Sequence, residues 1–360
     1  MNIKVSKSDF LQVLTTAIKA VPTKTSLPIL ENFLLSIEDG VLSVTASDAN
    51  ITVIARCKAD GEGKACVPAK TIRDIVSTLP DGEVSILSGK EIATISWSKG
   101  HSTIPVFLVS DYPEINAPKG EGFSITTDTL KKALKHTLPH TSSDEIRPQL
   151  CGVCFNPTDS GLDIVASDAH TMCVYPIEGG GKPSDSFLLP SGAASLVRDI
   201  PAESVTITSD ESIIRFESDN IAIQAKKIIG KFPNYSSIIP NGNPNVFTFP
   251  VAMLMDSIRR VSICSNKSTN FIKLSLNPLE GIIIESQDTS YGCDAREEID
   301  FGSYDGDEMV IGLRADLVLK TLAGLDADKA TMRLSDSRRA VLVVGDGDPS
   351  KAIVMPISVN

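Results

Sequence analysis

The sequence predicts an α+β protein that consists of three similar domains. The first observation is that an Asp follows a strand-like apolar run at Asp48, Asp168 and Asp288, which are 120 residues apart in a chain of 360. The second is that each third opens on a short strand and an amphipathic helix. The third is that a second helix follows at a constant spacing. Repetition at a long fixed period indicates that a whole structural unit recurs.

The first elements of each third are a strand and a helix. The three segments are IKVSKSDFLQVLTTAI, FSITTDTLKKALKHTL and FTFPVAMLMDSIRRVS. Each begins with alternating apolar residues, continues with a polar or Pro cap, and then places apolar residues at helical spacing. The strands that follow read VLSVTASD, LDIVASD and IIIESQD, and their alternation is typical of half-buried strands.

A second helix and a hairpin come next in each third. The helical segments span 67–79, 189–200 and 311–322, and Pro68, Pro190 and Gly312 near their starts are 122 residues apart. The hairpins read EVSILSGKEIATISW, SVTITSDESIIRFES and TMRLSDSRRAVLVVG. Linkers rich in Pro, Gly and Asn lie near 119–122 and 241–245. These linkers predict domains at 1–121, 122–244 and 245–360.

Composition and charge exclude some classes of protein. The net charge of −11 argues against a protein that simply coats nucleic acid, because such binding needs a basic surface. No apolar stretch approaches the ~20 residues of a membrane span, and the first residues lack the apolar core of a signal peptide. We therefore expect a cytoplasmic protein without a membrane partner. The seven scattered cysteines are expected to be reduced, buried thiols.

Basic residues are concentrated on the predicted helices of all three thirds, whereas acidic residues gather in loops and hairpins. One interpretation is that these are ordinary solvated helix faces, since surface lysines are common. The other is that the helices of the three domains share one surface that faces a polyanion. The recurrence of basic helices in each third favours the second interpretation.

Three local patterns raise catalytic or metal-binding alternatives. Cys151 and Cys154 have the spacing of half a zinc site or of a redox motif, but no second pair accompanies them. The segment GGGKPS at 179–184 resembles a phosphate loop but has Pro where Ser or Thr is needed. Ser167, Asp168 and His170 invite a hydrolase hypothesis, although no Gly-x-Ser-x-Gly elbow exists. The histidines show no metal spacing, so we expect no metal, no cofactor and no catalytic residue.

Five segments together resemble one known family. They are TSLPILENFLL (25–35), VPAKTIRDIVSTLP (67–80), VASDAHTMCVY (165–175), GKFPNYSSIIP (230–240) and AIVMPI (352–357). In order and spacing they are similar to the bacterial DNA polymerase III beta subunit, the sliding clamp. The resemblance covers the whole chain. It implies a non-enzymatic ring: two chains of three clamp domains join head to tail into a six-domain toroid, with helices lining the hole and sheets outside.

The resemblance implies that the ring encircles double-stranded DNA without reading its sequence. A clamp should be retained by topology, because strong phosphate contacts would hold it in one place. A negative total charge with a weakly positive lining suits that task. Lys24 and Arg198 match basic positions of the family, and the other candidates rest on helix charge alone. The predicted DNA-facing residues are Lys24, Lys131, Lys132, Lys135, Arg198, Arg259 and Arg260.

The resemblance also implies an apolar groove between the second and third domains. It would bind peptides of the Gln-Leu-x-Leu-Phe type from the DNA polymerase III alpha subunit, the clamp loader, repair polymerases and mismatch-repair proteins. Met side chains suit a groove that serves several partners. The matching positions are Leu150, Ser167, His170, Thr171, Met172, Pro240, Val246, Ile353, Val354, Met355, Pro356 and Ile357. Where many relatives have Gly-His-Arg, this chain has Ala169, His170 and Thr171, and its tail extends through Ser358, Val359 and Asn360.

A homodimer interface is implied between the first domain of one chain and the third domain of the other. Alignment places Ile104, Ile263 and Cys264 there. Lys70 and Arg73 would then face Glu297 and Glu298. Since an isolated surface ion pair contributes only ~0–1 kcal/mol, apolar contacts and strand pairing should dominate. A third hypothesis, a repeat scaffold that binds proteins but never DNA, differs from the clamp only in the function of the helix charges.

Overall fold

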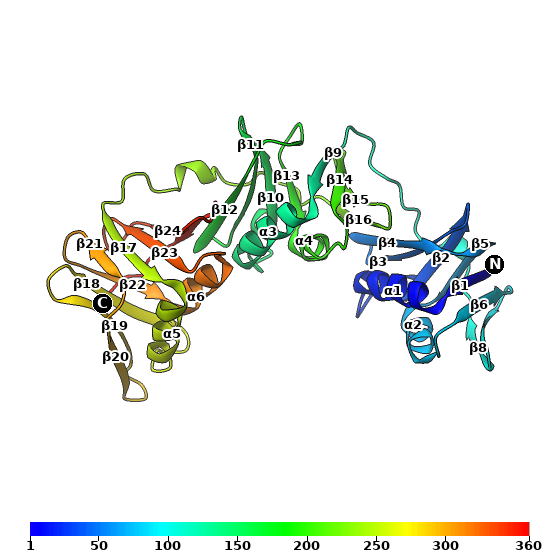
Figure 1. Cartoon of the computed structure of the whole chain (residues 1–360), viewed down its shortest axis with the longest axis horizontal. Coiled ribbons are helices and arrows are strands. Elements are labelled where there is room, and N and C mark those ends of the chain that lie inside the picture. The colour runs from blue at the N-terminus through cyan, green and yellow to red at the C-terminus, as the bar shows by residue number, and fades with distance from the viewer. Residues whose placement is uncertain (360) are drawn as a thin grey trace. The chain divides into compact units, whose positions relative to one another are not determined.

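The computed structural model describes residues 1–359 of the protein, which form two compact units (Figure 1). The first unit contains Met1–Asp128 and Ser195–Lys227, and the second contains Thr129–Ala194 and the described residues from Ile228 onward. Asn360, the last residue of the tail considered above, lies outside the described residues. Within 1–359 no helix has the length and apolar character needed to cross a membrane.

The first unit contains a twelve-stranded antiparallel sheet in the order β8-β7-β6-β1-β5-β2-β3-β4-β16-β15-β14-β9. Its strands are β1 (Asn2–Ser6), β2 (Asn32–Glu38), β3 (Val41–Ser47), β4 (Ile51–Lys58), β5 (Asp60–Pro68), β6 (Glu83–Ser88), β7 (Ile92–Trp97), β8 (Gly100–Pro105), β9 (Phe123–Thr126), β14 (Ser204–Ser209), β15 (Ile213–Glu217) and β16 (Ile221–Lys226). Alternate residues of β1 are buried, as expected for strands with one face on a core.

Helices α1 (Lys7–Ala17) and α2 (Ala69–Thr78) lie side by side in this unit (Figure 1). The buried residues of α1 are Phe10, Val13, Leu14 and Ala17, which lie on one helical face and pack towards β3 and β4. Short 3-10 turns η1 (Ile18–Ala20), η2 (Pro28–Glu31) and η3 (Val109–Asp111) connect the elements. The helix α4 (Ser191–Arg198) begins in the second unit and ends in the first.

The second unit contains a nine-stranded sheet, in the order β13-β10-β11-β12-β25-β24-β23-β17-β21, and a four-stranded sheet, β20-β19-β18-β22. The strands are β10 (Gly152–Pro157), β11 (Gly161–Ser167), β12 (Thr171–Glu178), β13 (Phe187–Pro190), β17 (Asn245–Pro250), β18 (Phe271–Asn277), β19 (Gly281–Asp288), β20 (Cys293–Ile299), β21 (Ser303–Asp305), β22 (Met309–Arg314), β23 (Lys329–Leu334), β24 (Val341–Gly345) and β25 (Lys351–Val354).

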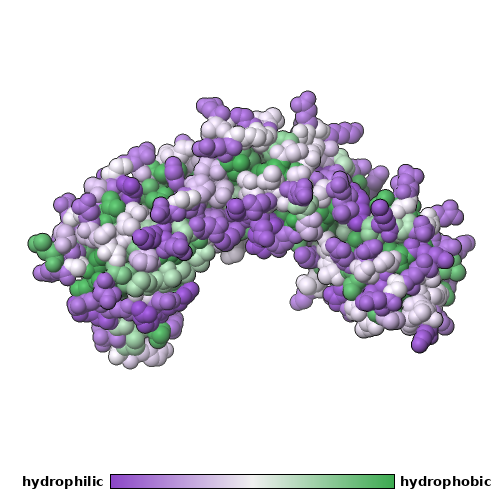
Figure 2. Space-filling view, in the orientation of Figure 1, coloured by the Kyte–Doolittle hydropathy of each residue, from purple (hydrophilic) through white to green (hydrophobic). Residues whose placement is uncertain are grey.

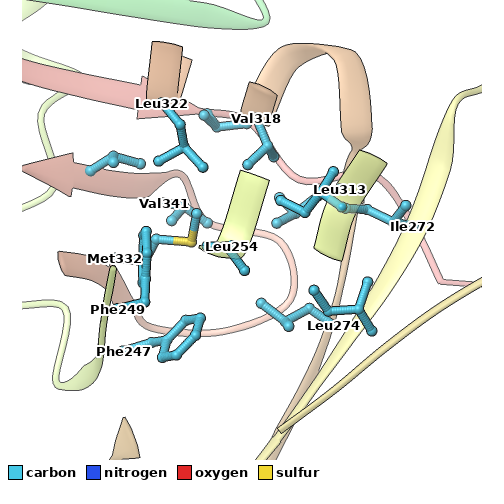
Figure 3. Close-up of a cluster of buried hydrophobic side chains, with 14 of the residues drawn as sticks. Phe247, Phe249, Leu254, Ile272, Leu274, Leu313, Val318, Leu322, Met332 and Val341 are labelled. Atoms are coloured by element: carbon cyan, nitrogen blue, oxygen red, sulfur yellow. The ribbon is translucent and has the colours of Figure 1, made fainter. Parts of the chain in front are cut away.

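Helices α5 (Val251–Ser262) and α6 (Ala315–Gly324) pack against each other and against these two sheets. Their buried faces meet strand residues in one apolar core, where the labelled side chains of Figure 3 point toward one another. Leu254 of α5, Leu322 of α6 and Phe247 of β17 are each at most 1% exposed. The unit also contains α3 (Thr127–Thr137), which starts in the first unit, with η4 (Leu138–His140), η5 (Pro148–Leu150) and η6 (Tyr235–Ser237).

The middle third of the chain contributes to both units because sheets continue from one third to the next. Strand β16 pairs with β4 of the first third, and β12 pairs with β25 of the last third. Every predicted helix is present in the described residues, and each first-helix segment begins with a strand, namely β1, β9 and β17. The segment predicted as helical from residue 311 is wrong at its start, because residues 311–314 belong to β22 and α6 begins at Ala315. The domain limits at 121/122 and 244/245 stay predictions.

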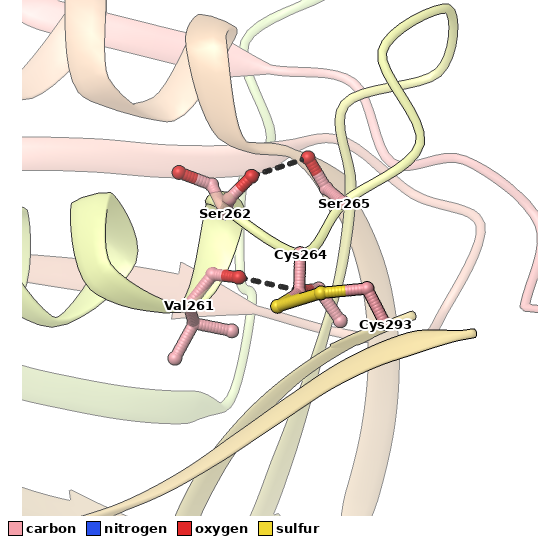
Figure 4. The surroundings of a disulfide bond; sticks show 6 residues. Val261, Ser262, Cys264, Ser265 and Cys293 are labelled. Atoms are coloured by element: carbon pink, nitrogen blue, oxygen red, sulfur yellow. Dashed lines mark hydrogen bonds between the residues drawn. A yellow bond between two sulfur atoms is a disulfide. The ribbon is translucent and has the colours of Figure 1, made fainter. Parts of the chain in front are cut away.

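The prediction that all seven cysteines are reduced thiols is wrong at two positions. Cys264, just after α5, and Cys293, at the start of β20, form a disulfide (Figure 4). They are 29 residues apart, with Cα atoms separated by 5.3 Å. Two elements that are distant in sequence are brought together by the packing of α5 on β20, which spacing alone does not reveal. The remaining five cysteines are free.

Candidate functional site

A cavity of about 290 Å³ lies in the second unit beside the turn that joins β11 to β12. Residues from four segments line it: the end of the 141–150 loop, the turn at 167–172, the segment 232–238 and the end of the chain. They are Arg147, Gln149, Leu150, Ser167, Ala169, His170, Thr171, Met172, Phe232, Pro233, Tyr235, Ile238, Ile353 and Met355. We call this cavity the groove. Its lining is mainly apolar, as binding sites for apolar side chains require.

Seven of the twelve residues predicted for the groove line it: Leu150, Ser167, His170, Thr171, Met172, Ile353 and Met355. The other five lie outside its lining: Pro240, Val246, Val354, Pro356 and Ile357. Alternation along β25 explains the division of the terminal run, because successive side chains of a strand point to opposite faces. Ile353 packs with Met172 and Tyr235, whereas Ala352 and Val354 belong to the core of Figure 3. Ile357 forms a bridge to Gly312 of β22 instead.

The wall of the groove contains a buried tyrosine held by polar groups. Tyr235 donates a 2.7 Å hydrogen bond to Asp163 and accepts one of 3.0 Å from the amide of Asn156. Burial, together with the hydrogen bond to Asp163, raises the pKa of Tyr235 well above its usual range. The phenol therefore stays neutral, and its ring is fixed as part of an apolar wall before any ligand arrives.

The turn between β11 and β12 is built by side chains that bind its own backbone. Asp168 Oδ1 accepts hydrogen bonds from the backbone N–H of His170 at 2.9 Å and of Thr171 at 2.6 Å. Ser167 Oγ accepts the N–H of Ala169 and donates to the carbonyl of Thr171. Ala169 has a φ of 73°, a left-handed conformation that such local bonds must hold in place. Met355 N–H binds His170 O at 2.8 Å, which attaches the terminal segment to this turn.

The other oxygen of Asp168 faces a lysine. Lys320 Nζ of α6 lies 2.5 Å from Asp168 Oδ2, with side chains that are 25% and 16% exposed. Burial alone would raise the pKa of Asp168, but the hydrogen bonds and charge of Lys320 and the backbone donors of the turn outweigh it and lower that pKa. Buried His140 lies 2.8 Å from Thr171 Oγ1 through Nδ1. Burial, and then the charge of Lys320, lowers the pKa of His140 to about 3, so this imidazole is neutral at pH 7.

A buried ion pair connects α3 to the last third of the chain. His136 Nε2 lies 2.9 Å from Asp348 Oδ2, and both side chains are at most 2% exposed. Asp348 also accepts the backbone N–H groups of Asp326 and Ser350. Burial disfavours the charged imidazole, but the bonds to Asp348 and to the carbonyl of Lys132 outweigh it and raise the pKa of His136. The pair helps to hold the middle and last thirds together.

The predicted DNA-facing residues lie on or near helices, and most carry an acidic partner. In the second unit, Lys131, Lys132 and Lys135 are exposed on α3, and Lys135 pairs with Asp326. Arg259 and Arg260 are exposed on α5 and pair with Asp256 and Glu297. In the first unit, Lys24 is exposed and Arg198 pairs with Asp199. On the face shown in Figure 2, hydrophilic residues predominate and hydrophobic residues form small scattered areas.

Two strands at the ends of their sheets could pair with another chain at the predicted dimer interface. Within residues 1–359, β8 is hydrogen-bonded only to β7, and β20 only to β19. Such edges are templates for pairing with another chain. Ile104 on β8 is 3% exposed, whereas Ile263 just after α5 is 70% exposed.

Three of the four charged residues predicted at the interface, namely Arg73, Glu297 and Glu298, have partners in their own chain. Arg260 makes a bidentate pair with Glu297, at 3.0 and 2.6 Å. A residue predicted to face DNA therefore binds a residue predicted at the dimer interface. Arg73 on α2 pairs with Asp74, and Glu298 pairs with Arg296. Lys70 lines a separate cavity of about 620 Å³ in the first unit.

The geometry of the described residues does not support the catalytic and metal-binding alternatives. Cys154 belongs to the apolar cluster beneath the groove, and burial raises its pKa to about 12, which keeps the thiol protonated. Ser167 and Asp168 use their side chains within the turn, and no hydrogen bond joins either of them to the imidazole of His170 among the described residues. Strand β13, not a helix, follows 179–184, so this segment lacks the helix of a phosphate loop. No group of three or more His, Cys, Asp or Glu residues arranged to hold a metal occurs within 1–359.

Sequence reasoning missed six lining residues and discussed a seventh, Ala169, only as a departure from the family pattern. The missed residues are Arg147, Gln149, Phe232, Pro233, Tyr235 and Ile238. A signal was present for the last four, because they lie in GKFPNYSSIIP, a segment already matched to the family. Nothing in the sequence distinguishes Arg147 and Gln149, which reach the groove only because η5 folds against β10.

Family comparison identifies three consecutive matches. Residues 1–116 match the DNA polymerase III beta subunit, N-terminal domain, and residues 124–234 match its central domain. Residues 236–358 match the C-terminal domain of the same subunit. Together the matches cover most of the chain, in the order N-terminal, central and C-terminal domain.

Similar proteins extend over the full length of the chain. A beta sliding clamp of Vibrio cholerae is 27% identical over 368 residues, covering 99% of this chain and all of the relative. The crystal structure of the DNA polymerase III subunit beta from Pseudomonas aeruginosa matches with a TM-score of 0.94 at 25% identity, covering 100% of both chains. A Caulobacter crescentus beta sliding clamp with polyethylene glycol bound to its putative beta-motif tethering region matches at 0.93 and 27%, covering 100% of this chain and 99% of that one.

Proposed function

Because the chain belongs to the DNA polymerase III beta subunit family, we propose that two copies close head to tail around duplex DNA and that the groove binds peptides of partner proteins. The chain is a DNA polymerase processivity factor, a sliding clamp that does no chemistry itself. The proposal places it in the cytoplasm. It also includes the partners named above: the polymerase alpha subunit, the clamp loader, repair polymerases and mismatch-repair proteins.

The observation that carries the peptide-binding proposal is the groove. Leu150, Met172 and Ile353 are each at most 5% exposed and form an apolar floor. Exposed His170 and Arg147 provide polar groups at its edge. A volume of about 290 Å³ accommodates the Leu and Phe side chains of a short peptide, not a folded domain. Such pre-formed pockets are where the few anchoring side chains of an interface contribute most of the affinity.

The test is fluorescence anisotropy of a labelled Gln-Leu-x-Leu-Phe peptide. The intact protein should bind it saturably, and a variant that ends at Val354 should not, because it lacks Met355 and its hydrogen bond to His170 O. A variant that ends at Ile357 is the matched control and should bind as the intact protein does. A peptide with Ala in place of its Leu and Phe residues should not bind. Failure of the intact protein to bind the original peptide would contradict the proposal.

The exposed lysines of α3 support the encirclement of DNA. A triple change of Lys131, Lys132 and Lys135 to Glu should shorten retention on nicked circular DNA, because it places repulsive charge opposite the phosphates. The matched control changes Lys64, Lys119 and Lys182 to Glu, which alters the net charge equally at exposed positions outside the helices. Cutting the circle should release the unaltered protein. Unchanged retention of the triple variant would show that a different surface faces the DNA, whereas no retention of the unaltered protein would favour the scaffold hypothesis.

A further inference from the structure

The ion pair between Lys320 and Asp168 is not needed to form the turn that walls the groove. The first third of the chain contains the same turn: Asp48 Oδ1 accepts the N–H groups of Asn50 and Ile51 at 2.8 and 2.7 Å. Ala49 there has a φ of 75°, against 73° for Ala169. Asp48 has no ion pair among the described residues, so this turn folds without a lysine. The turn at Asp48 can therefore be compared with the turn at Asp168 to ask what Lys320 adds.

The two turns differ in what surrounds them. At the positions 120 residues before Thr171 and His140, the first third has Ile51 and Ala20. In the middle third, Thr171 Oγ1 donates to Asp168 Oδ1 at 3.1 Å and lies 2.8 Å from His140 Nδ1. Since the single hydroxyl proton of Thr171 is directed at Asp168, the Nδ1–H of His140 must donate to Thr171 Oγ1. The result is a continuous network from α6 through the turn to η4, in which Thr171 is 2% exposed.

The network joins the two parts of the chain that form the groove. Asp168 and Thr171 belong to the middle third, which supplies Leu150 and Met172, whereas Lys320 belongs to the last third, which supplies Ile353 and Met355. We propose that Lys320 and Asp168 are positioning residues: their ion pair fixes the turn at 167–171 relative to α6 and so sets the shape of the groove for a partner peptide. This inference rests on the proposed function of the groove.

The physical reason is the cost of an unpaired buried charge. Without Lys320, Asp168 Oδ2 would keep its partial burial and lose the one ion pair that it makes within residues 1–359, which favours movement of the turn toward solvent. That movement displaces the backbone of His170, whose carbonyl holds Met355 N–H, and it breaks the alignment of Thr171 with His140. Affinity for a peptide is sensitive to such displacement because the groove must be formed before binding.

The experiment measures the Kd of the labelled Gln-Leu-x-Leu-Phe peptide for the full chain and its variants. Lys320→Met should raise Kd about tenfold, the range expected when a supporting charge pair is broken. Lys320→Arg keeps the charge and should restore Kd to within about twofold. Asp168→Asn keeps an oxygen for the turn but removes the pair, and it should weaken binding similarly. The double variant should be no weaker than Lys320→Met alone, because both changes break one interaction.

The matched control is Lys273→Met. Lys273 pairs with Glu285 at 2.7 Å in the same unit, with comparable side-chain exposure, but it lies on β18 and outside the groove lining. This variant should leave Kd unchanged, while its melting temperature falls about as much as that of Lys320→Met. If Kd is unchanged in Lys320→Met and Asp168→Asn while the unaltered protein binds, the inference is overturned and the proposed function stands. If the unaltered protein does not bind the peptide, both fail.

Discussion

At the scale of single residues, the most consequential groups are buried charges with specific partners. His136 and Asp348 are both almost fully buried and bind each other at 2.9 Å. A buried pair is costly to break, because the remaining charge keeps its desolvation penalty without its attraction. Burial opposes the charged form of both groups, but this contact and the neighbouring hydrogen bonds outweigh it, raising the pKa of His136 and lowering that of Asp348, so the stability of the protein depends on pH through the pair.

Replacing Asp348 by Asn should destabilise the protein most in a window from about pH 4 to pH 6.5. Since folding raises the pKa of His136, this residue contributes fully to the free energy of unfolding when the pH is below its pKa in the unfolded chain. The contribution is lost as the pH rises through its pKa in the folded protein. Since folding lowers the pKa of Asp348, this residue contributes to the free energy of unfolding when the pH is above its pKa in the unfolded chain. That contribution is lost as the pH falls through its pKa in the folded protein. We expect a loss of about 3 kcal/mol at pH 5.5, and a smaller loss at pH 9.

Thermal unfolding of the Asp348→Asn variant at pH 5.5 and pH 9 measures this difference. The control is Asp316→Asn, which removes a more exposed carboxylate that pairs with Arg314. That variant should show a small loss with no trend between the two pH values. A loss in Asp348→Asn that is equal at pH 5.5 and pH 9 would show that the imidazole is not charged in the folded protein.

At the scale of elements, helix α5 shows how one segment can serve both a core and a surface. Its buried residues include Val251, Leu254, Ile258 and Val261, at intervals of three and four, and it follows Pro250, which has no N–H to lose. Between them, Arg259 and Arg260 are exposed, and Met253 is 46% exposed. The buried face fixes the helix, so residues on the other face can change without loss of the fold.

Two substitutions on this helix should therefore have very different effects. Leu254→Ala removes a side chain that is 1% exposed in the core of Figure 3 and should lower the free energy of unfolding by about 3 kcal/mol. Met253→Ala, one residue earlier, should change it by less than about 0.5 kcal/mol. Urea titration followed by circular dichroism compares the two. Equal losses would mean that α5 does not pack in the orientation described.

The sequence reveals elements more completely than the contacts between them. Asp48 and Asp168 were visible as a repeat because each side chain caps its own turn, a local interaction that depends on neighbouring residues alone. The sequence did not show that Ile353 lines the groove while Val354 lies in the core, since this depends on the register of β25 against β12. The same is true of the pairs Lys320–Asp168 and Cys264–Cys293, whose partners meet only after helices pack on strands. Seven groove residues could be named from a family pattern, whereas Arg147 and Gln149 required the folded loop.

At the scale of the whole molecule, the proposed ring depends on sheet edges that remain unpaired within residues 1–359. β8 belongs to the first unit and β20 to the second, so a head-to-tail pair of chains would join them twice. Charged residues along β20, such as Asp294 and Glu298, oppose indiscriminate pairing of this edge. The exposed Ile263 close to β20 supplies apolar contact area for a specific partner.

Ile263→Asp should convert the protein from a dimer to a monomer in sedimentation equilibrium. The side chain is 70% exposed, so the fold of the single chain should be unaffected, as circular dichroism can verify. Leu279→Asp is the control: this residue is 94% exposed on the turn between β18 and β19, and its change should leave the dimer intact. A monomeric unaltered protein, or a dimer that tolerates Ile263→Asp, would contradict the proposed interface.

The position of β25 has a consequence for synthesis of the protein on the ribosome. This strand fills the gap between β12 and β24, yet it consists of residues 351–354, so every other strand of its sheet is made first. Until it emerges, β12 exposes a free edge and the groove lacks Ile353 and Met355. If the groove binds partner peptides as proposed, an unfinished chain should bind them weakly, and its exposed strand edge stays open to pairing with other chains until β25 is added.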